Sequence, residues 1–332
     1  MKQIRIRRPD DFHLHLRQGE MLKAVAPYSA AAFSRALVMP NTLPPVTTPE
    51  GLKSYRDEIM AAAPGFEPLM SFKLLPKLDP GAIPALKKVG AVAGKYYPAG
   101  ATTNAEDGIR EPGEAYPLFE ALQQAGLVLC VHAEDPDAPV FEREAAFLPH
   151  VTRIARDFPR LKIVVEHLSS KAAVEALYDL PRSVGATITA HHLAFTAEQM
   201  LGGKLDSRLF CKPIVKFDAD RKALIEAATS SSGRFFFGSD SAPHSPEAKA
   251  DGAAGSFTAP VALSLLAGVF EEAGKLETYE DFTSRFGAEF YGLPLNRSEL
   301  IGEKSHWQVP AETGGVVPVC AGEELAWGFR DP

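Results

Sequence analysis

Hydrophobic residues along this chain come in short runs that recur at regular intervals. The repeat averages roughly 30 residues, which is typical of one strand followed by one helix. The eight runs are FHLHL, ALVMPN, LMSFKLL, VAGKYYP, LVLCVHAE, IVVEHLSS, ATITAHH and FFFGSD. The stretches between them include PEGLKSYRDEIMAAA and GEAYPLFEALQQAG, which predict helices. In the second, Leu118, Phe119 and Leu122 have helical spacing, and Gly126 marks the end of the helix.

Eight strand–helix units predict a TIM (β/α)8 barrel, for which about 250 residues or more is a typical length. The alternative is a doubly wound open sheet, but no G-x-G-x-x-G follows the first run. We find no linker rich in Gly, Pro or Ser, so residues 1–332 are predicted to form one domain. The tail after about residue 296 would pack on the barrel as a small C-terminal extension. The stretch 244–256 has the small residues of a mobile loop.

Charge and composition narrow the class of partner. The net charge of -7 argues against a nucleic-acid partner, which usually requires a basic patch. The three cysteines are scattered and odd in number, which favours reduced thiols over a disulfide framework. The N-terminus lacks the apolar segment of a signal peptide, and the longest nearly apolar stretch, 259–270, is too short to span a membrane and predicts a buried helix. We therefore expect a cytoplasmic protein with no membrane partner.

The first run lies in DFHLHLRQG, residues 11–19, and alternates strictly between apolar and polar positions. Residues two apart point to the same side of a strand, so one face would be apolar. The opposite face would carry His13, His15 and Arg17. A solvated polar face is the ordinary explanation of such a pattern. The other runs decide whether these histidines bind a metal.

Four other runs end in side chains that can take part in metal chemistry. They are Lys95, His132, His167 and Asp240. Each alone has an ordinary explanation: a histidine can be a structural hydrogen-bonding group, an aspartate a helix cap, and a lysine can reach solvent. In a TIM barrel, however, all strand ends open on one face, where these residues would meet His13 and His15. Four histidines and a carboxylate are suitable zinc ligands.

Lys95 is the unexpected member of this set. A protonated lysine donates hydrogen bonds and accepts none, and divalent cations would repel it. It must then be neutral or modified. Addition of CO₂ to the neutral amine gives a carbamate, which is a carboxylate on a long arm and could bridge two metal ions. A Schiff-base lysine is the competing role, but it would not explain the surrounding histidines.

Several segments, in chain order, resemble the dihydroorotase family of the amidohydrolase superfamily, specifically its shorter bacterial type that works as a homodimer. These segments are RRPDDFHLHLR, VMPNTLPPVTTPE, GKYYPAGATTN, VHAED, VEHLSSK, GSDSAPH and FYGLPLN. The resemblance runs through nearly the whole chain. It implies two Zn²⁺ per chain, bridged by N6-carboxylated Lys95 and a hydroxide. One ion would be held by His13, His15 and Asp240, and the other by His132 and His167.

The resemblance also implies a set of substrate-binding residues. They are Arg17, Asn41 and His244 for the substrate carboxylate, Thr102 and Thr103 in a flexible loop that closes over the acyclic substrate, and Ala254 and Gly255, which contact the ring through their backbone. Lys212 stands where an apolar residue is usual, at a position whose family contact is made by the backbone. Gly100 likewise stands where Asn is common.

The implied reaction is the reversible closure of N-carbamoyl-L-aspartate to L-dihydroorotate and water, in pyrimidine (UMP) biosynthesis. Asp240 would take the proton of the attacking hydroxide and deliver it to the leaving nitrogen. A hydantoinase or allantoinase would use the same metal centre without needing the carboxylate-binding residues. A metal-free scaffold protein is the alternative from another class, and it would have no need of the six ligands. His192 either lines the mouth of the barrel or has a structural role.

Overall fold

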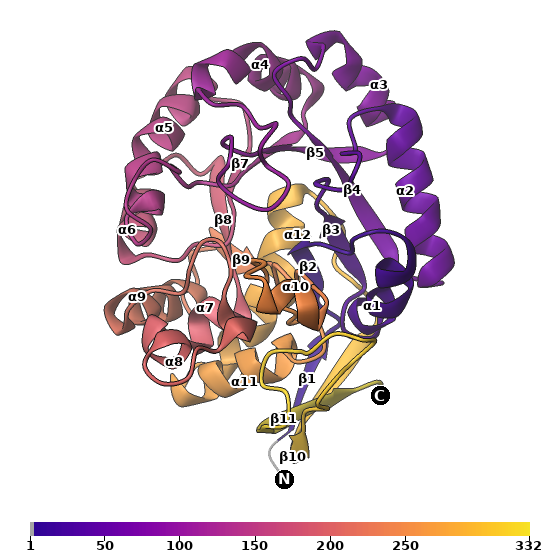
Figure 1. The fold of residues 1–332 in the computed structure, drawn as a ribbon, viewed down its shortest axis with the longest axis vertical. Coiled ribbons are helices and arrows are strands. Elements are labelled where there is room, and N and C mark those ends of the chain that lie inside the picture. Colours follow the sequence, from indigo (N-terminus) through magenta and orange to yellow (C-terminus); the bar gives the residue numbers. More distant parts are fainter. Residues whose placement is uncertain (1–2) are drawn as a thin grey trace.

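The computed structural model describes residues 3–332, and its main feature is a parallel eight-stranded barrel. Each strand lies beside the next one in the chain, and helices cover the outside (Figure 1). The strands are β2 (Asp10–Leu14), β3 (Arg35–Val38), β4 (Glu67–Lys73), β5 (Ala91–Tyr96), β6 (Val128–Val131), β7 (Ile163–Val165), β8 (Val184–Ile188) and β9 (Phe235–Phe237). Every predicted run overlaps one of these strands. The predicted TIM barrel is therefore confirmed.

The barrel closes where its first and last strands meet. The backbone N–H of Asp240 donates to the carbonyl of His13 at 2.8 Å, and that of His15 donates to the carbonyl of Ser241 at 2.9 Å. Leu14 and Ser241 also form a parallel bridge. This closing seam therefore places residues predicted to bind metal on both of its sides.

The helices follow the strands in the order that the pattern predicts. They are α1 (Gly19–Ala32), α2 (Pro49–Ala62), α3 (Ile83–Lys88), α4 (Tyr116–Ala125), α5 (Arg143–Asp157), α6 (Lys171–Asp179), α7 (Ala190–Ala194), α8 (Ala197–Leu201), α9 (Asp218–Ala228), α10 (Pro246–Ala250), α11 (Ala262–Glu272) and α12 (Phe286–Tyr291). Shorter helical turns span Pro80–Ala82, Pro112–Ala115, Ser207–Leu209, Leu276–Thr278 and Asp281–Arg285. Helix α4 ends as predicted at Gly126, whose φ of 65° is a left-handed conformation that glycine adopts without strain. The stretch predicted as a buried helix forms α11.

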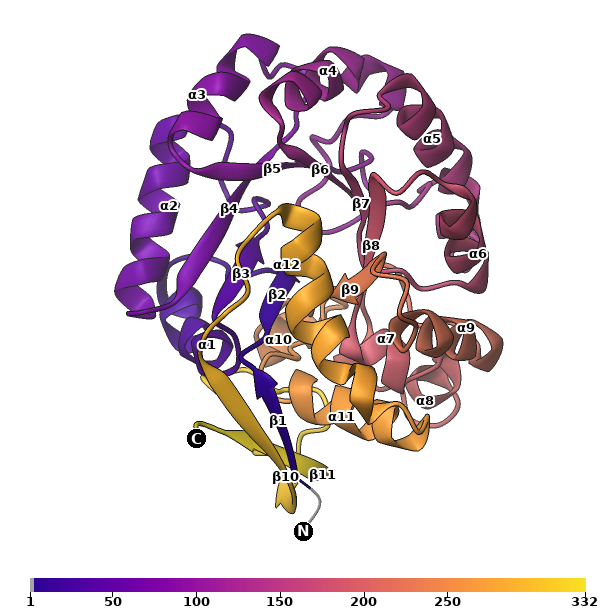
Figure 2. The same ribbon diagram turned by 180° about the vertical axis from the view of Figure 1, so that it is seen from behind.

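Two hydrophobic clusters fill the space on either side of the barrel wall. The larger lies between the strands and the surrounding helices. The smaller fills the barrel interior and includes Phe12 and Phe236, with Phe286 from α12. Helix α12 crosses the end of the barrel where the strands begin (Figure 2). A Cβ at Gly287 would lie 2.3 Å from the Phe12 ring, so the glycine lets α12 seal this end.

The tail forms a small C-terminal extension, as predicted, but it contains strands that the sequence did not predict. It forms β10 (Glu299–Gln308) and β11 (Glu324–Arg330), which join β1 (Gln3–Arg7) in an antiparallel sheet of order β1-β10-β11. This sheet lies beside the barrel near both ends of the chain (Figure 2). We did not predict these strands. Strand β10 pairs with β1 at the other end of the chain, with Gln3 opposite Glu303, so this pairing has no local signal. The division of residues 1–332 into a single domain stays a prediction.

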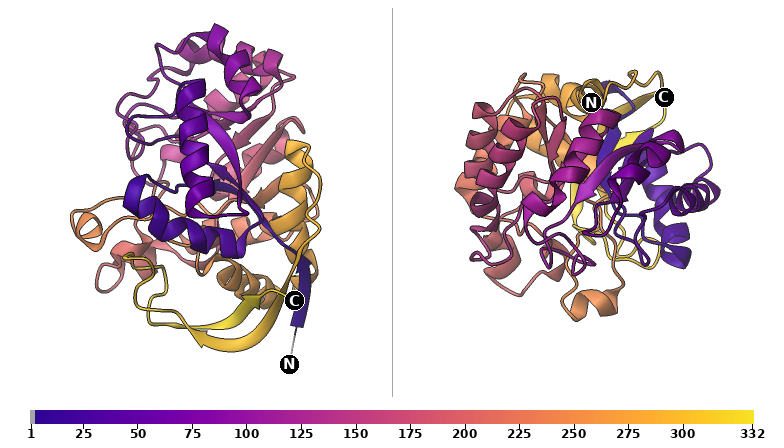
Figure 3. Two further views of the ribbon diagram at one scale, coloured as in Figure 1. Left: turned by 90° about the vertical axis from the view of Figure 1, so that its right-hand side faces the viewer. Right: turned by 90° about the horizontal axis from the view of Figure 1, so that it is seen from above.

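The stretch expected to be a mobile loop contains a defined helix. Residues of α10 project from one side of the molecule (Figure 3), and the Ser245 hydroxyl caps the helix by accepting from the N–H of Ala248. Lys249, within this helix, donates to three backbone carbonyls. Across residues 3–332, no helix combines the length and the apolar character needed to cross a membrane.

Candidate metal centre

The carboxyl ends of the strands surround a small cavity that collects almost all of the predicted site residues. Its lining is His13, His15, Arg17, Asn41, Tyr97, Thr102, Thr103, His132, His167, Lys212, Asp240, Ala242, Ala254 and Gly255. Among the predicted residues, only Lys95 and His244 do not line it. The barrel thus brings residues from seven loops or strands to one place, as its topology requires.

One group of potential ligands lies across the closing seam. Oδ1 of Asp240 is 3.3 Å from Nε2 of His13 and 3.2 Å from Nε2 of His15. One donor atom from each residue lies within 4.8 Å of the other two, and all three side chains are buried or nearly so. This arrangement can hold a metal ion between two imidazoles and a carboxylate.

A second pair of histidines faces the first group. Nδ1 of His132 lies 3.2 Å from Nε2 of His167. The ring centroids of His13 and His167 are 4.9 Å apart, which joins the two groups into one cluster. The cluster therefore contains five of the six predicted ligands in direct proximity.

Lys95 completes the cluster from β5. Its side chain is fully buried, and its Nζ has no hydrogen-bond partner among the described residues. Burial lowers the pKa of this amine. The nitrogen lies 5.2 Å from the centroid of the Tyr97 ring. An unpartnered buried amine is costly, so Lys95 fits a neutral or modified state better than a free ammonium.

Three histidines are held from outside the cluster by side-chain oxygens. His13 Nδ1 lies 2.8 Å from Glu166 Oε2, and His15 Nδ1 lies 2.7 Å from Asn41 Oδ1. His132 Nε2 lies 2.8 Å from Glu134 Oε2. Such partners fix the tautomer of a metal-binding histidine, so that the other nitrogen presents its lone pair.

We did not predict Glu134 and Glu166 from the sequence. Both are buried, and each stands within two residues of a predicted ligand, since Glu134 follows His132 by two and Glu166 precedes His167. A glutamate inside an apolar strand end is unusual unless it has a partner. That combination of position and burial is the signal that would have identified them.

The electrostatics favour neutral imidazoles at three of the four histidines, beside an ionised carboxylate. At His13, burial acts against the charged form, but the nearby carboxylate of Glu166 raises the pKa. Burial lowers the pKa of His15 to about 4, and it also lowers those of His132 and His167. Burial alone would raise the pKa of Asp240, but hydrogen bonds from His13 and His15 keep it well below its usual range. Neutral histidine and ionised aspartate are the forms that bind metal.

The backbone is strained at three site residues. Arg17, His167 and Asp240 have φ values of 60°, 44° and 44°, in the left-handed region that non-glycine residues avoid. Each follows the end of a barrel strand. Strain of this kind persists where the surrounding structure enforces it, and it is concentrated at functional sites.

The pattern of alternation in the first run is interrupted. The pairing of β2 with β3 shifts between Asp11 and Leu14. As a result, Phe12 packs inside the barrel, whereas Leu14 packs in the outer cluster. Asp11 supports this irregular strand, because its Oδ1 accepts from the N–H of His13 at 3.1 Å and of Ser239 at 2.7 Å. A bulge re-aims side chains in this way.

Arg17 lies at the rim of the cavity, beside His244. Its Nε donates to the carbonyl of Pro243 at 3.0 Å, and one of its amino nitrogens lies 2.9 Å from His244 Nε2. The same His244 nitrogen is 3.0 Å from the carbonyl of Ala254. Burial, followed by the positive charge of Arg17, lowers the pKa of His244 to about 3, so His244 is neutral at pH 7. The guanidinium therefore remains the positive charge at this rim.

The loop that carries Thr102 and Thr103 lies against the other side of the cavity. The Asn41 amide donates to the carbonyl of Thr103 at 3.2 Å, and the Thr103 hydroxyl lies 3.4 Å from the carbonyl of Ala254. Lys73, a buried residue of β4 that we did not predict, donates to the carbonyl of Asn104 at 2.6 Å and also pairs with Asp107. Lys73 thus ties the loop to the barrel wall.

We considered two roles for His192, lining the mouth of the barrel or a structural one, and its contacts fit the structural role. Its Nδ1 lies 2.9 Å from the Thr189 hydroxyl and its Nε2 lies 3.0 Å from the carbonyl of Pro213. It is buried and does not line the catalytic cavity. Lys212, in the same segment as Pro213, does line it.

Comparison with known proteins agrees with this geometry. Residues 10–297 match the Amidohydrolase family, so the chain belongs to that family. A dihydroorotase from Teredinibacter turnerae is 45% identical over 332 aligned residues, which cover 96% of each chain. The crystal structure of dihydroorotase in complex with 5-fluoroorotic acid from Saccharomyces cerevisiae has a TM-score of 0.94 at 35% identity, covering 100% of this chain and 99% of the yeast chain. A dihydroorotase structure from Campylobacter jejuni has a TM-score of 0.92 at 38% identity, covering 98% of this chain and 97% of its own.

Proposed function

We propose that this chain is a dihydroorotase that closes N-carbamoyl-L-aspartate to L-dihydroorotate and water, and reverses that reaction. The observation that carries the proposal is the position of Arg17 at the rim of a buried histidine cluster. The cluster supplies the chemistry of a cyclic amidohydrolase, and the guanidinium supplies a site for the substrate carboxylate. The full-length relatives named dihydroorotase support the same substrate class.

We propose two zinc ions per chain as the cofactor. His13, His15 and Asp240 would hold one ion, His132 and His167 the other, and carboxylated Lys95 would bridge them. The fit rests on buried nitrogens of the cluster that have no hydrogen-bond partner in residues 3–332, such as Nδ1 of His167 and Nζ of Lys95. When bound, such ions lower the pKa of a water molecule and polarise a carbonyl.

The side chains of the site would carry out proton transfer, bind the substrate carboxylate and cover the cavity. The carboxylate of Asp240 is ionised and lies at the cluster, so it can accept the proton of the attacking water and return it to the ring nitrogen. Arg17 can bind the substrate carboxylate in a two-pronged geometry. The loop with Thr102 and Thr103 covers the cavity beside Asn41, and it meets the segment of Ala254 and Gly255, which lines the same cavity.

A hydantoinase-like activity is the alternative, and one measurement separates the two. We expect purified protein to turn over L-dihydroorotate far faster than hydantoin, because hydantoin lacks the carboxylate that Arg17 would bind. A preference for hydantoin would overturn the proposed substrate. Comparable rates on L-dihydroorotate and hydantoin would show that Arg17 does not recognise the substrate carboxylate.

We also propose that the protein works as a homodimer in the cytoplasm. Its three cysteines, Cys130, Cys211 and Cys320, are free and buried, which suits a reducing compartment. Sedimentation of the purified protein at micromolar concentration tests the oligomeric state. A single species with the mass of one chain would contradict the homodimer.

A further inference from the structure

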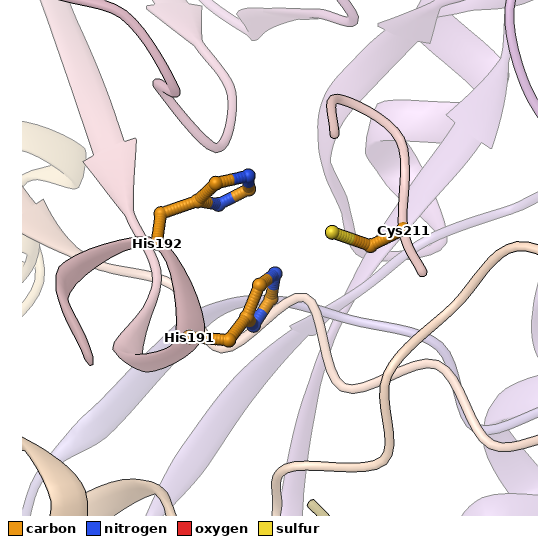
Figure 4. A group of neighbouring side chains, drawn as sticks. All are labelled: His191, His192 and Cys211. Carbon is orange, nitrogen blue, oxygen red and sulfur yellow. The ribbon is translucent and has the colours of Figure 1, made fainter. Parts of the chain in front are cut away.

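A second cluster of potential ligands lies outside the catalytic cavity. His191 and His192 belong to α7, the short helix that follows β8, and Cys211 lies in the segment after the turn Ser207–Leu209. The three side chains point toward one another (Figure 4), and one donor atom from each lies within 4.8 Å of the other two. All three are buried, and none is among the residues that line the catalytic cavity.

His191 is the residue of this cluster whose unpaired ring nitrogens indicate a ligand. Its side chain is fully buried, and neither ring nitrogen has a hydrogen-bond partner among residues 3–332. An unsatisfied buried polar group typically costs about 1–3 kcal/mol. Its ring is directed into the space shared with His192 and Cys211 (Figure 4). A cation in that space would satisfy one nitrogen directly.

The other two residues share a single hydrogen-bond acceptor, so a ligand would displace few contacts. Nε2 of His192 and Sγ of Cys211 both donate to the same carbonyl, that of Pro213, at 3.0 and 3.1 Å. A cation at Nε2 of His192 would move the ring proton to Nδ1. The Thr189 hydroxyl, 2.9 Å away, could accept it, because a hydroxyl is both donor and acceptor. The chain therefore already contains the outer partner that a metal-binding histidine needs.

We propose that His191, His192 and Cys211 form a third metal site, distinct from the catalytic centre and suited to Zn²⁺. Two neutral imidazoles and one thiolate are a typical donor set for this ion, and a water molecule or the Pro213 carbonyl would supply the fourth ligand. Binding replaces the thiol proton of Cys211 with a Zn–S bond and releases that proton to solvent. No oxidation or reduction is involved.

The position of the site indicates what the ion does. It would connect α7, at the end of β8, to the segment 210–215, which carries Lys212 into the catalytic cavity. Because all three ligands are buried, the ion would have little access to substrate. We infer that it fastens these two segments together, so that it stabilises one wall of the cavity without taking part in the reaction.

Cobalt substitution tests this site separately from the catalytic centre. Co²⁺ bound to a thiolate gives a sulfur-to-cobalt charge-transfer band in the near ultraviolet, whereas the proposed catalytic ligands contain only nitrogen and oxygen. We expect the band in the Co²⁺-loaded full-length protein, together with about three metal ions per chain. Cys211→Ser should lose the band and one ion, while its visible d–d bands from the catalytic centre remain. Cys320→Ser removes a different buried thiol and is the matched control. It should retain both the charge-transfer band and the full metal content.

A second variant covers the case in which Cys211→Ser does not fold. His191→Gln keeps Cys211 and places an amide in the same space. It should bind the third ion at least about tenfold more weakly, which is the low end of the effect of removing a ligand or its direct support. The proposal is overturned if Co²⁺-loaded wild-type protein shows no thiolate band, or if the band survives in Cys211→Ser. A stoichiometry of only two ions under excess metal would also overturn it.

Discussion

His13 and Asp240 lie opposite each other across the seam that closes the barrel, and they are joined twice. The backbone N–H of Asp240 donates to the carbonyl of His13 at 2.8 Å, and the side-chain atoms Oδ1 and Nε2 lie 3.3 Å apart. The backbone bond sets the distance between the first and last strands. The two side chains therefore come to one potential metal position only when the barrel is closed.

Asp240 is the proposed proton carrier, and Asp240→Asn tests that role. The amide keeps the shape of the side chain but cannot accept the proton of water. We expect kcat for L-dihydroorotate to fall by at least about 10²-fold, the lower end for general acid–base catalysis. Steady-state kinetics at fixed metal content measures this. A variant with near-normal kcat would assign the proton transfer to another group.

Glu166 and Glu134 hold two histidines that we propose as ligands, so their loss should weaken metal binding more than it alters the fold. In Glu166→Gln and Glu134→Gln, the histidine tautomer is no longer fixed by a carboxylate. We expect the affinity for Zn²⁺ to fall about 10–100-fold in each variant. Competition with a chelator measures the affinity. Glu20→Gln, on the exposed face of α1, is the control and should bind normally. Unchanged affinity in both test variants would show that these carboxylates do not support the centre.

Arg17 is the residue that we propose to recognise the substrate carboxylate. Arg17→Met keeps part of the stem and removes the charge. We expect a loss of roughly 2–4 kcal/mol in kcat/KM for L-dihydroorotate, since one partner of a buried charge pair is missing. Metal content should be unchanged, and slow turnover of hydantoin should change far less. Equal losses on both rings would give Arg17 a structural role.

Lys73 anchors the loop that covers the cavity. In Lys73→Met, the donor to Asn104 and the ion pair with Asp107 are lost together, which should destabilise the docked loop by about 1.5–3 kcal/mol. We expect faster proteolysis within residues 99–109 and a lower kcat/KM, with both catalytic ions retained. Lys77→Met, at an exposed position just after β4, should show neither change. Proteolysis at the wild-type rate in Lys73→Met would show that Lys73 does not hold the loop in place.

Lys249 gives a pH-dependent prediction. Its ammonium donates to the carbonyls of Phe210, Ala253 and Gly255, and burial lowers its pKa to about 8. The charge is present below pH 8 and is lost as the pH rises above it. Because burial disfavours the ammonium, losing the charge removes a desolvation cost, so the packed wall at Gly255 should be favoured in alkali. Lys249→Arg keeps its charge throughout this range. We expect the ratio of wild-type KM to Lys249→Arg KM to fall between pH 7 and pH 9.5. A constant ratio would contradict this.

The sequence predicted the barrel, and it predicted that the candidate ligands would lie together, because both depend on local signals. A short apolar run that ends in His132 or Asp240 marks a strand end, and the barrel topology then requires these ends to meet. The supporting residues carry no such signal. Lys73 and Glu166 are single charged residues within apolar runs, and only their partners, dozens of residues away, show their roles.

Long-range pairing limited the prediction of the tail. The strand β10 pairs with β1 at the other end of the chain, and the pairing of β10 with β11 shifts register between Lys304 and Trp307. A register shift breaks the regular alternation on which a strand prediction depends. The irregular alternation around Phe12 escaped prediction for the same reason, since the shift lies in the pairing of β2 with β3.

The terminal sheet has a consequence for protein engineering. Strands β1 and β11 flank the same strand, with Arg5 and Arg330 both opposite Ile301, so these two residues lie two strand spacings apart, roughly 10 Å. A linker of a few glycines should bridge that gap and yield a circular permutant. New ends placed in the exposed stretch 202–204, before Leu205, should leave the sheet and the barrel seam intact. Such a permutant would carry a fusion partner on the flank of the barrel instead of beside the sheet.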